Sequence, residues 1–240
     1  EMQRSLVGSE MCIRDSPSYL RVLMQSLRLA VVTTLICAAV GYPFGYLTAR
    51  LGRRMRSVVL LLLIVPFWTN ALIRIYGWRI LLMSNGLLNN LLLALGLASE
   101  PLKLLYTDGA VLLGMVYALV PFMILPAFST VDKLDFSVVE AARDLGAGPL
   151  YAFLTVTVPL TLSGLAAGCV LVFIPSMGLF FLNDLLGGSK TVLAGGLIQQ
   201  LINSRDLPMA AALSVLLLAV TGAVIAVYRK VGGTGDMSMF

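Results

Sequence analysis

The sequence contains no histidine and only three cysteines, Cys12, Cys37 and Cys169. These cysteines provide neither a disulfide framework nor the ligand spacing of a metal site. The sequence also lacks a glycine-rich GxxxxGK[ST] loop, the motif that cradles nucleotide phosphates. We therefore expect no catalytic residue, no metal site and no cofactor bound by this chain.

Charged residues are scarce as well, at 12% of the 240 residues, whereas apolar residues make up 59% and the mean hydropathy is +0.94. In soluble domains about a quarter of the residues are charged, so this composition predicts a protein embedded in a lipid bilayer. A membrane span needs about 20 mostly apolar residues and must be helical, because unpaired backbone groups are costly in lipid. Five stretches qualify, at roughly 23–49, 58–82, 109–131, 157–181 and 208–228.

The basic residues of the short loops predict the orientation of the chain. Arginines crowd between the first two spans and a basic pair closes the last one: Arg50, Arg53, Arg54, Arg56, Arg229 and Lys230. Because such residues favour the cytoplasm, we place these loops and the 132–157 connection inside and the 83–108 and 182–207 connections outside. The bias is moderate, since the outer connections carry Lys103, Lys190 and Arg205.

This orientation places the start of the chain outside the membrane. Residues 1–16 contain no apolar run that could span and lack the hydrophobic core of a signal peptide. We interpret 1–16 as a non-native or disordered segment, such as a cloning or sequencing scar, with a short extracellular arm as the alternative. On this interpretation residues 17–240 form one transmembrane domain, and the natural protein has a further helix before Ser18.

A short charged island lies between two of the long apolar segments. It reads Glu140-Ala141-Ala142-Arg143-Asp144-Leu145-Gly146 and is followed by Val156-Thr157-Val158-Pro159. A helix of small residues, a glycine break and a proline at the start of the next helix predict a protruding helix-turn-helix. Leu145, Tyr151 and Phe153 would offer apolar side chains to a soluble partner. The pattern indicates a docking loop at about 132–157 rather than an active site.

Glu140 also has a purely local explanation. Ser137 precedes it by three residues, so the pair could form a capping box that starts the first loop helix. Asp135 is a second candidate for the same cap. Gly146 permits the chain reversal, and Pro149 suits the first turn of the following helix.

The outer half of the second span is unusual for a membrane helix. The segment 66–79 contains a proline, an amide and two arginines, which are costly there unless they face protein or water. One interpretation is an interfacial belt, with Trp68 and Tyr76 among the lipid headgroups. The other is a broken helix end that lines a translocation path, with Asn70 capping a helix or bridging between helices.

The fourth span contains Gly164 and Gly168, whose spacing of four predicts close helix packing. Asp184 follows the end of this span, beside Phe181. As a loop residue the carboxylate requires no function, and a role in solute passage is the alternative.

The docking loop resembles the EAA loop that is the cytoplasmic signature of ABC importer permeases. Val156 and Val158 stand where that family has isoleucine and leucine, and Gly148-Pro149 stands where relatives often have serine and a polar or basic residue. Over about residues 18–230 the sequence is similar to the PotB-type permeases of spermidine/putrescine importers. The runs that carry this resemblance are 63–70, 73–77, 120–126 and 184–188.

The resemblance implies an all-α, polytopic membrane helical bundle of the type I ABC importer permease (MetI-like) kind, with six spans of which five are visible here. It implies a bacterial inner-membrane location, a cytoplasmic ABC ATPase dimer that uses ATP and Mg, a second permease subunit and an extracytoplasmic substrate-binding protein. Nucleic acid is not among the implied partners. The residues that would couple to the ATPase are Glu140, Ala141, Ala142, Asp144, Leu145, Gly146 and Pro159.

The implied substrate class suggests a set of residues for the path. Polyamines are extended polycations, so a path should combine a carboxylate with aromatic faces that attract ammonium groups. Asp184 is the best carboxylate available, and we expect Trp68, Asn70, Tyr76 and Phe181 to accompany it if the second and fourth spans meet at the outer mouth.

Two other classes of function remain open. A secondary transporter or channel subunit for a small solute would want ionisable pairs near the midplane, but the spans lack acidic residues and Arg28 has no obvious mate. A membrane enzyme would need a nucleophile with its base, yet histidine is missing and the acids lie in loops. The sequence therefore favours a transport subunit powered by a partner.

Overall fold

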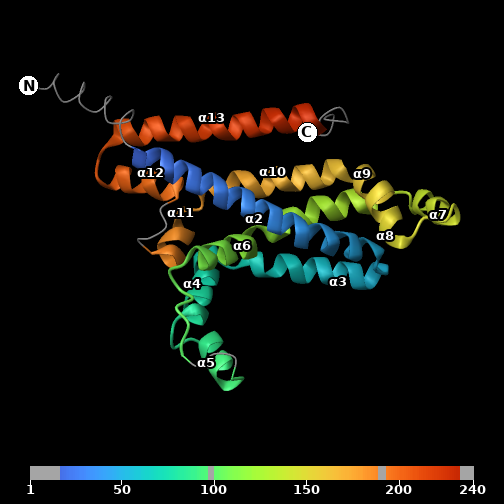
Figure 1. The fold of residues 1–240 in the computed structure, drawn as a ribbon, viewed down its shortest axis with the longest axis horizontal. Coiled ribbons are helices and arrows are strands. Elements are labelled where there is room, and N and C mark those ends of the chain that lie inside the picture. Colours follow the sequence, from blue (N-terminus) through green and yellow to red (C-terminus); the bar gives the residue numbers. More distant parts are fainter. Residues whose placement is uncertain (1–16, 97–99, 189–192, 233–240) are drawn as a thin grey trace, which may run out of the picture. The chain divides into compact units, whose positions relative to one another are not determined.

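The computed structural model describes residues 17–96, 100–188 and 193–232, and the regular elements within these ranges are all helices (Figure 1). The expected all-α fold is therefore confirmed. The segment 1–16, for which we predict a non-native or disordered stretch, lies outside the described residues.

The helices, in chain order, are α2 (Pro17–Arg50), α3 (Arg53–Ile64), the 3₁₀ helix η1 (Val65–Trp68), α4 (Ala71–Leu82), α5 (Leu87–Ala94), α6 (Asp108–Asp132), α7 (Phe136–Asp144), α8 (Pro149–Ala152), the π-helical turn η2 (Phe153–Thr157), α9 (Val158–Leu160), α10 (Leu162–Gly178), α11 (Phe180–Leu182), the π-helical turn η3 (Asn183–Gly187), α12 (Ala194–Asn203) and α13 (Leu207–Gly232).

Among the described residues, 3 helices are long and apolar enough to cross a membrane: Arg21–Arg50, Asp108–Asp132 and Leu207–Ala226. The number rises to 5 if two bent helix pairs each count as one span, Arg53–Trp68 with Ala71–Ala94 and Pro149–Leu160 with Leu162–Gly178. These segments correspond to the stretches that hydropathy predicts. Each stretch was expected to form a helix, and the second and fourth are helix pairs bent by 93° and 69°.

The break in the second span has a local cause. Pro66 occupies the first turn of η1, and its carbonyl accepts hydrogen bonds from the Thr69 backbone N–H at 3.3 Å and from Thr69 Oγ1 at 2.7 Å. Thr69 itself is extended, with φ −84° and ψ 153°, so the helix cannot continue through it. The predicted helix break is confirmed, and α4 starts afresh at Ala71.

The fourth span is bent by 69° between Leu160 and Leu162. Pro159 has no N–H and its ring crowds the carbonyl four residues earlier. The π-helical turn η2, which lies directly before α9, widens the backbone at this point. The helical run before the bend starts at Pro149, earlier than the predicted boundary at 157.

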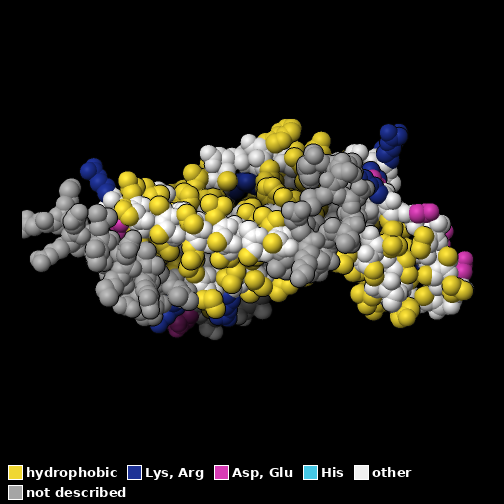
Figure 2. Space-filling model, turned by 90° about the horizontal axis from the view of Figure 1, so that it is seen from above, with side chains coloured by type: hydrophobic (Ala, Val, Ile, Leu, Met, Phe, Trp, Pro, Cys, Tyr) yellow, Lys and Arg dark blue, Asp and Glu magenta, His cyan; other side chains and the backbone are white. Residues whose placement is uncertain are grey.

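The described residues divide into two compact units, which we treat separately. Unit 1 contains the described residues of 17–32, 71–96, 100–115, 174–188 and 193–221, and unit 2 contains 33–70, 116–173 and 222–232. Hydrophobic side chains spread over the face in view in Figure 2, with few charged residues among them. Helix α3 contains no buried residue at all, which suits a surface that lipid or another membrane protein covers.

Unit 2 packs around the second half of α6, where small residues let the helices approach closely. A Cβ atom added to Gly41 of α2 would lie 2.8 Å from Met123 Cγ, and one added to Gly168 of α10 would lie 2.6 Å from Met123 Sδ. A Cβ atom at Gly164 would likewise clash with Thr130. The predicted close packing of Gly164 and Gly168 is confirmed.

Unit 1 is held together by polar contacts as well as by packing. Ser26 Oγ of α2 accepts a hydrogen bond from the Ala194 backbone N–H at 2.8 Å, which satisfies an otherwise unpaired donor at the start of α12. The buried side chain of Asn89 pairs with both backbone groups of Leu102, at 2.9 and 3.0 Å. This amide holds Leu102 against α5.

Candidate functional site

The docking loop of unit 2 opens with helix α7, which Asp135 caps. The Asp135 side chain accepts a hydrogen bond from the Ser137 backbone N–H at 3.0 Å, and this bond lowers the pKa of the Asp135 carboxyl. Ser137 lies inside the helix, so the alternative in which Ser137 and Glu140 form a capping box is wrong. The exposed Glu140 carboxylate is not needed for the cap.

The C-terminus of α7 is closed by two backbone hydrogen bonds. The Gly146 N–H donates to the Arg143 carbonyl at 2.9 Å, and the Ala147 N–H donates to the Ala142 carbonyl at 3.1 Å. Gly146 has φ +90°, a region that residues with a side chain rarely adopt. These features form a Schellman motif, and they confirm that Gly146 supplies the predicted chain reversal.

The second arm of the loop starts at α8, with Gly148 at the N-cap and Pro149 in the first turn. The predicted place of Pro149 is therefore confirmed. Pro159 was expected at the start of a helix, and it does lie in the first turn of the short helix α9. This helix follows directly on α8 and η2, so the helical run continues through Pro159 up to the bend at Thr161.

The turn between the arms carries apolar side chains that solvent reaches. Leu145 is 90% exposed, and Leu150 and Tyr151 are exposed as well. Phe153 differs from the prediction, because it is half-buried against the core cluster that contains Tyr42. Leu145 and Tyr151 therefore remain available to a partner, whereas Phe153 serves the packing of unit 2.

Two clefts adjoin α7. One, of ≈ 450 Å³, is lined by Ala49, Arg50, Phe136, Val139, Glu140 and Arg143. The other, of ≈ 400 Å³, is lined by Glu140, Arg143, Asp144, Gly146, Ala147 and Pro149. Glu140 and Arg143 line both clefts, so an acidic and a basic side chain stand together in the middle of the docking surface. Of the other predicted coupling residues, Ala141 is exposed and Ala142 is half-buried.

Two arginines whose charge predicts the orientation of the chain also hold the start of the loop. The Arg50 guanidinium lies over the ring of Tyr46 at 4.8 Å and over the ring of Phe136 at 5.3 Å. Arg56 forms a two-point ion pair with Asp132. Nothing in the sequence identifies Phe136 or Asp132 as the partners of these arginines.

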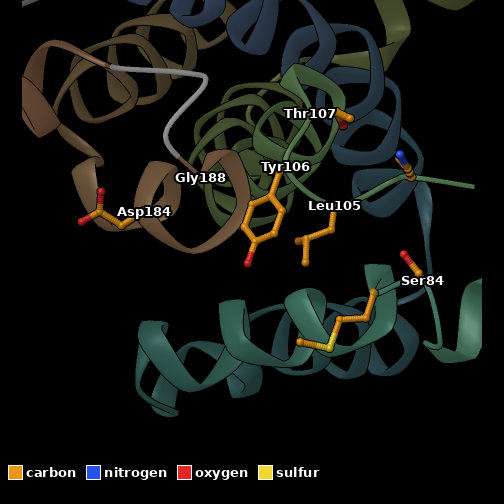
Figure 3. Close-up of a pocket in the computed structure, with 8 residues that line it drawn as sticks. Ser84, Leu105, Tyr106, Thr107, Asp184 and Gly188 are labelled. Atoms are coloured by element: carbon orange, nitrogen blue, oxygen red, sulfur yellow. The ribbon is translucent and has the colours of Figure 1, made fainter.

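The other part of the candidate site is a cavity of ≈ 750 Å³ in unit 1 (Figure 3). It is lined by Met83, Ser84, Lys103, Leu105, Tyr106, Thr107, Asp184 and Gly188. Asp184 also lines a second cleft of ≈ 460 Å³, together with Asn183, Gly188, Gly196, Gln199, Gln200 and Asn203. The carboxylate of Asp184 points away from the Tyr106 ring.

Tyr106 is a residue of this cavity that sequence reasoning missed. Its φ is +62°, which is unusual for a residue with a bulky side chain. Residues with such strained backbone angles occur most often at functional sites. Its N–H donates to the Leu186 carbonyl at 3.0 Å, and its hydroxyl accepts from Arg79 at 3.3 Å. A Cβ atom at Gly188 would lie 2.8 Å from the Tyr106 ring. No pattern in the sequence distinguishes such a tyrosine from any other.

The residues predicted to accompany Asp184 are only partly brought near it. Helix α4, which carries Tyr76, contacts η3, which carries Asp184, so within unit 1 the second span meets the segment that follows the fourth span. Tyr76 is exposed with Arg79 over its ring at 5.9 Å, and Phe181 packs edge-on against Phe180. Neither Tyr76 nor Phe181 is among the lining residues of the two clefts.

Trp68 and Asn70 belong to unit 2. Trp68 ends η1 and is 82% exposed, and the exposed Asn70 lies in the break before α4. This exposure is compatible with both the interfacial belt and the helix-end interpretation. Their role in a path stays a prediction.

Comparison with known sequences identifies relatives for most of the chain. The family described as binding-protein-dependent transport system inner membrane component matches residues 41–231. The chain is 48% identical over 215 residues to the spermidine/putrescine transport system permease protein PotB of Escherichia coli, across 89% of this chain and 78% of that protein. It is 44% identical over 216 residues to PotB of Haemophilus influenzae, across 90% of this chain and 76% of that protein.

Solved structures share the fold at low sequence identity. A chain of a bacterial alginate ABC transporter in complex with an alginate pentasaccharide-bound periplasmic protein matches with a TM-score of 0.77 and 15% identity, over 94% of this chain and 83% of that one. A chain of the MetNI methionine ABC transporter in an inward-facing conformation matches with a TM-score of 0.60 and 17% identity, over 88% and 94%. The chain therefore belongs to the family of binding-protein-dependent transport system inner membrane components, with the PotB permeases among its relatives, and is a membrane transport subunit rather than an enzyme.

Proposed function

We propose that the chain is the permease subunit of an ATP-driven importer of polyamines such as spermidine and putrescine. The observation that carries this proposal is the 48% identity to the Escherichia coli PotB permease over 89% of the chain. The docking loop fits the same function, because the chain has no phosphate loop of its own and needs a partner to supply ATP hydrolysis.

Helix α7 and the turn after it would couple the permease to the ATPase. A cytoplasmic ABC ATPase dimer, which uses ATP and Mg, would receive the exposed Leu145 in an apolar groove and pair with Glu140 and Arg143. The Schellman turn at Gly146 makes the presentation of these groups rigid. Closure of the ATPase dimer would move this loop and rotate the attached spans as rigid bodies. A second permease subunit and an extracytoplasmic binding protein complete the proposed assembly.

Asp184 is the residue proposed to bind the solute. The ≈ 750 Å³ cavity contains Lys103, and its ammonium group repels a polycation. The ≈ 460 Å³ cleft has Asp184 beside the side-chain amides of Gln199 and Asn203, and the described residues that line it include no cation. Amide oxygens accept hydrogen bonds from an ammonium group and the carboxylate neutralises its charge, so this cleft is the better place for one end of a polyamine. Trp68, Asn70, Tyr76 and Phe181 remain in the proposal as further contacts along the path.

Uptake in cells tests the proposed substrate. Cells without their own polyamine importers would receive this permease together with its ATPase, second permease and binding protein, and the uptake of labelled spermidine and putrescine would be measured. Saturable uptake that disappears when the permease is omitted supports the proposal. Uptake indistinguishable from cells without the permease, with all subunits present in the membrane fraction, contradicts it.

A further inference from the structure

A stack of side chains in unit 2 connects the docking helix with the bend before α10. Arg50, the last residue of α2, lies between the rings of Tyr46 and Phe136. Tyr46 in turn meets the Phe153 ring edge-on, with centroids 5.0 Å apart, and Phe153 contacts the Tyr42 ring at 5.9 Å. The stack therefore touches the loop on both arms, at the first residue of α7 and in η2.

The stack ends at the bend itself. The Tyr42 hydroxyl shares a hydrogen bond of 2.5 Å with Thr161 Oγ1, and Thr161 Oγ1 also donates to the Thr157 carbonyl at 2.7 Å. The Tyr42 hydroxyl is therefore the donor of the shared bond. Because Thr161 is the residue between α9 and α10, one face of α2 reaches from the docking helix to the pivot of the fourth span.

A second arginine fixes the other end of the linker that leads into α7. Asp132 is the last residue of α6, where the helix dipole disfavours a carboxylate. Arg56 compensates with its ion pair to Asp132, and its guanidinium also lies 4.9 Å from the centroid of the Phe128 ring. The linker of three residues between Asp132 and Phe136 is thus held at both ends, which leaves α7 little freedom to move independently of α2 and α3.

We infer that Arg50 is a positioning residue that transmits movement of the docking helix α7 to span α2. The covalent chain links α7 only to α6 and α8, so movement of α2 with the loop requires a non-covalent contact. Arg50 supplies that contact, because a planar guanidinium stacks on two rings at once and its charge is attracted to both faces. This inference rests on the proposed coupling function of the loop and goes beyond it.

An arginine that is merely solvated in the loop would contact neither an aromatic ring nor a carboxylate. Arg54, two residues into α3, is exposed and makes no ring, ion-pair or side-chain hydrogen-bond contact in the described part of the chain. It carries the same charge in the same cytoplasmic turn. Arg54 therefore serves as the matched control for Arg50.

The test compares Arg50→Met, Arg50→Lys and Arg54→Met in the complete transporter reconstituted in proteoliposomes. Assembly is scored by co-purification of the ATPase, and coupling is scored by the ATPase rate with and without loaded binding protein and by uptake. For Arg50→Met we expect normal assembly but a loss of binding-protein stimulation and of uptake of about three- to tenfold. Arg50→Lys should recover part of the loss, and Arg54→Met should match the parent.

A double variant separates a positioning role from general damage. If Arg50 acts through Phe136, adding Phe136→Leu to Arg50→Met should cause no further loss of stimulation. Losses that multiply in the double variant, or an Arg50→Met transporter with normal stimulation, would overturn the inference. A parent complex that assembles and hydrolyses ATP but does not import polyamines would contradict only the proposed substrate, because the ATPase readout still scores Arg50.

Discussion

Tyr42 and Thr161 share a buried hydrogen bond of 2.5 Å between the C-terminal half of α2 and the bend that precedes α10. Thr161 is fully buried and its hydroxyl is engaged twice, with Tyr42 and with the Thr157 carbonyl. Such a side-chain bond is lost entirely when the donor is removed, because no solvent reaches the acceptor.

Tyr42→Phe should therefore lower the free energy of unfolding in detergent by about 1 kcal/mol. Tyr46→Phe makes the same chemical change one turn later, at a hydroxyl with no hydrogen bond in the described residues, and should be nearly neutral. Denaturant unfolding monitored by fluorescence measures both. Equal losses for the two variants would show that the Tyr42 hydroxyl contributes nothing specific.

Gly168→Ala tests the close packing of α10 on α6. The added Cβ would lie 2.6 Å from Met123 Sδ and 3.3 Å from the Met123 backbone, so the variant should be destabilised by about 1–3 kcal/mol. Gly222→Ala is the control, because nothing lies within 4 Å of a Cβ at that position, and the gain in helix propensity should leave it neutral or slightly more stable. Thermal unfolding of the two variants in detergent measures the difference. A Gly168→Ala protein as stable as the Gly222→Ala protein would contradict the packing.

Gly146→Val tests the turn of the docking loop. At φ +90° a β-branched residue is strongly disfavoured, so the turn should deform and Leu145 should lose its presentation. Membrane insertion should survive, while uptake and ATPase stimulation by loaded binding protein should fall by about tenfold or more. Gly148→Val is the control, because Gly148 has φ −60° and nothing lies within 4 Å of an added Cβ. Normal uptake and normal ATPase stimulation in the Gly146→Val transporter would contradict the proposed role of the turn.

The stability of helix α7 should depend on pH through its cap, Asp135. The hydrogen bond from the Ser137 backbone lowers the pKa of Asp135 in the folded protein, so the cap is fully present above the ordinary carboxyl pKa and is lost as the pH falls through the lower folded value. A spin label at Leu145 should become more mobile in this acidic window. In Asp135→Asn the amide still caps but does not titrate, so its label mobility should not change there. The same acid transition in both proteins would contradict the assignment.

Asp184→Asn tests the solute path. The substitution keeps the shape of the side chain and removes the charge, so uptake of spermidine and putrescine should fall while assembly stays normal. Glu100→Gln makes the same change at an exposed residue of the 83–108 connection and should have no effect. Uptake equal to that of the parent at all polyamine concentrations would remove Asp184 from the path, and Tyr76 and Phe181 would then be interfacial residues only.

The sequence predicted the parts of the molecule that depend on local composition. Hydropathy located the 3 helices that are long enough to span and the 2 bent helix pairs. Gly146 marked the turn and Gly168 marked the close packing, because a side chain does not fit at either position. The bends at Thr69 and Thr161 were harder to place. A proline indicates a break in the helix, but the residue at which the helix breaks depends on how the neighbouring backbone groups form new hydrogen bonds.

Contacts between distant segments could not be predicted from one sequence. The stacking of Arg50 on Phe136, the edge-on packing of Phe153 against Tyr46 and the positive φ of Tyr106 all depend on tertiary packing. Composition and residue spacing predict the exposed cap and loop residues. They do not predict which aromatic ring an arginine will contact. The sequence therefore located the docking loop better than it identified the residues that support it.

The most direct test of the account is ATP-driven transport by the complete complex in proteoliposomes. Polyamine-loaded binding protein outside and ATP inside should give saturable accumulation of spermidine, with an ATPase rate that rises on addition of the loaded binding protein and not of the empty one. Both responses should be strongly reduced when the permease carries Gly146→Val in the same vesicles. Polyamine accumulation that proceeds without ATP, or an ATPase rate indifferent to the loaded binding protein in the parent complex, would contradict the account.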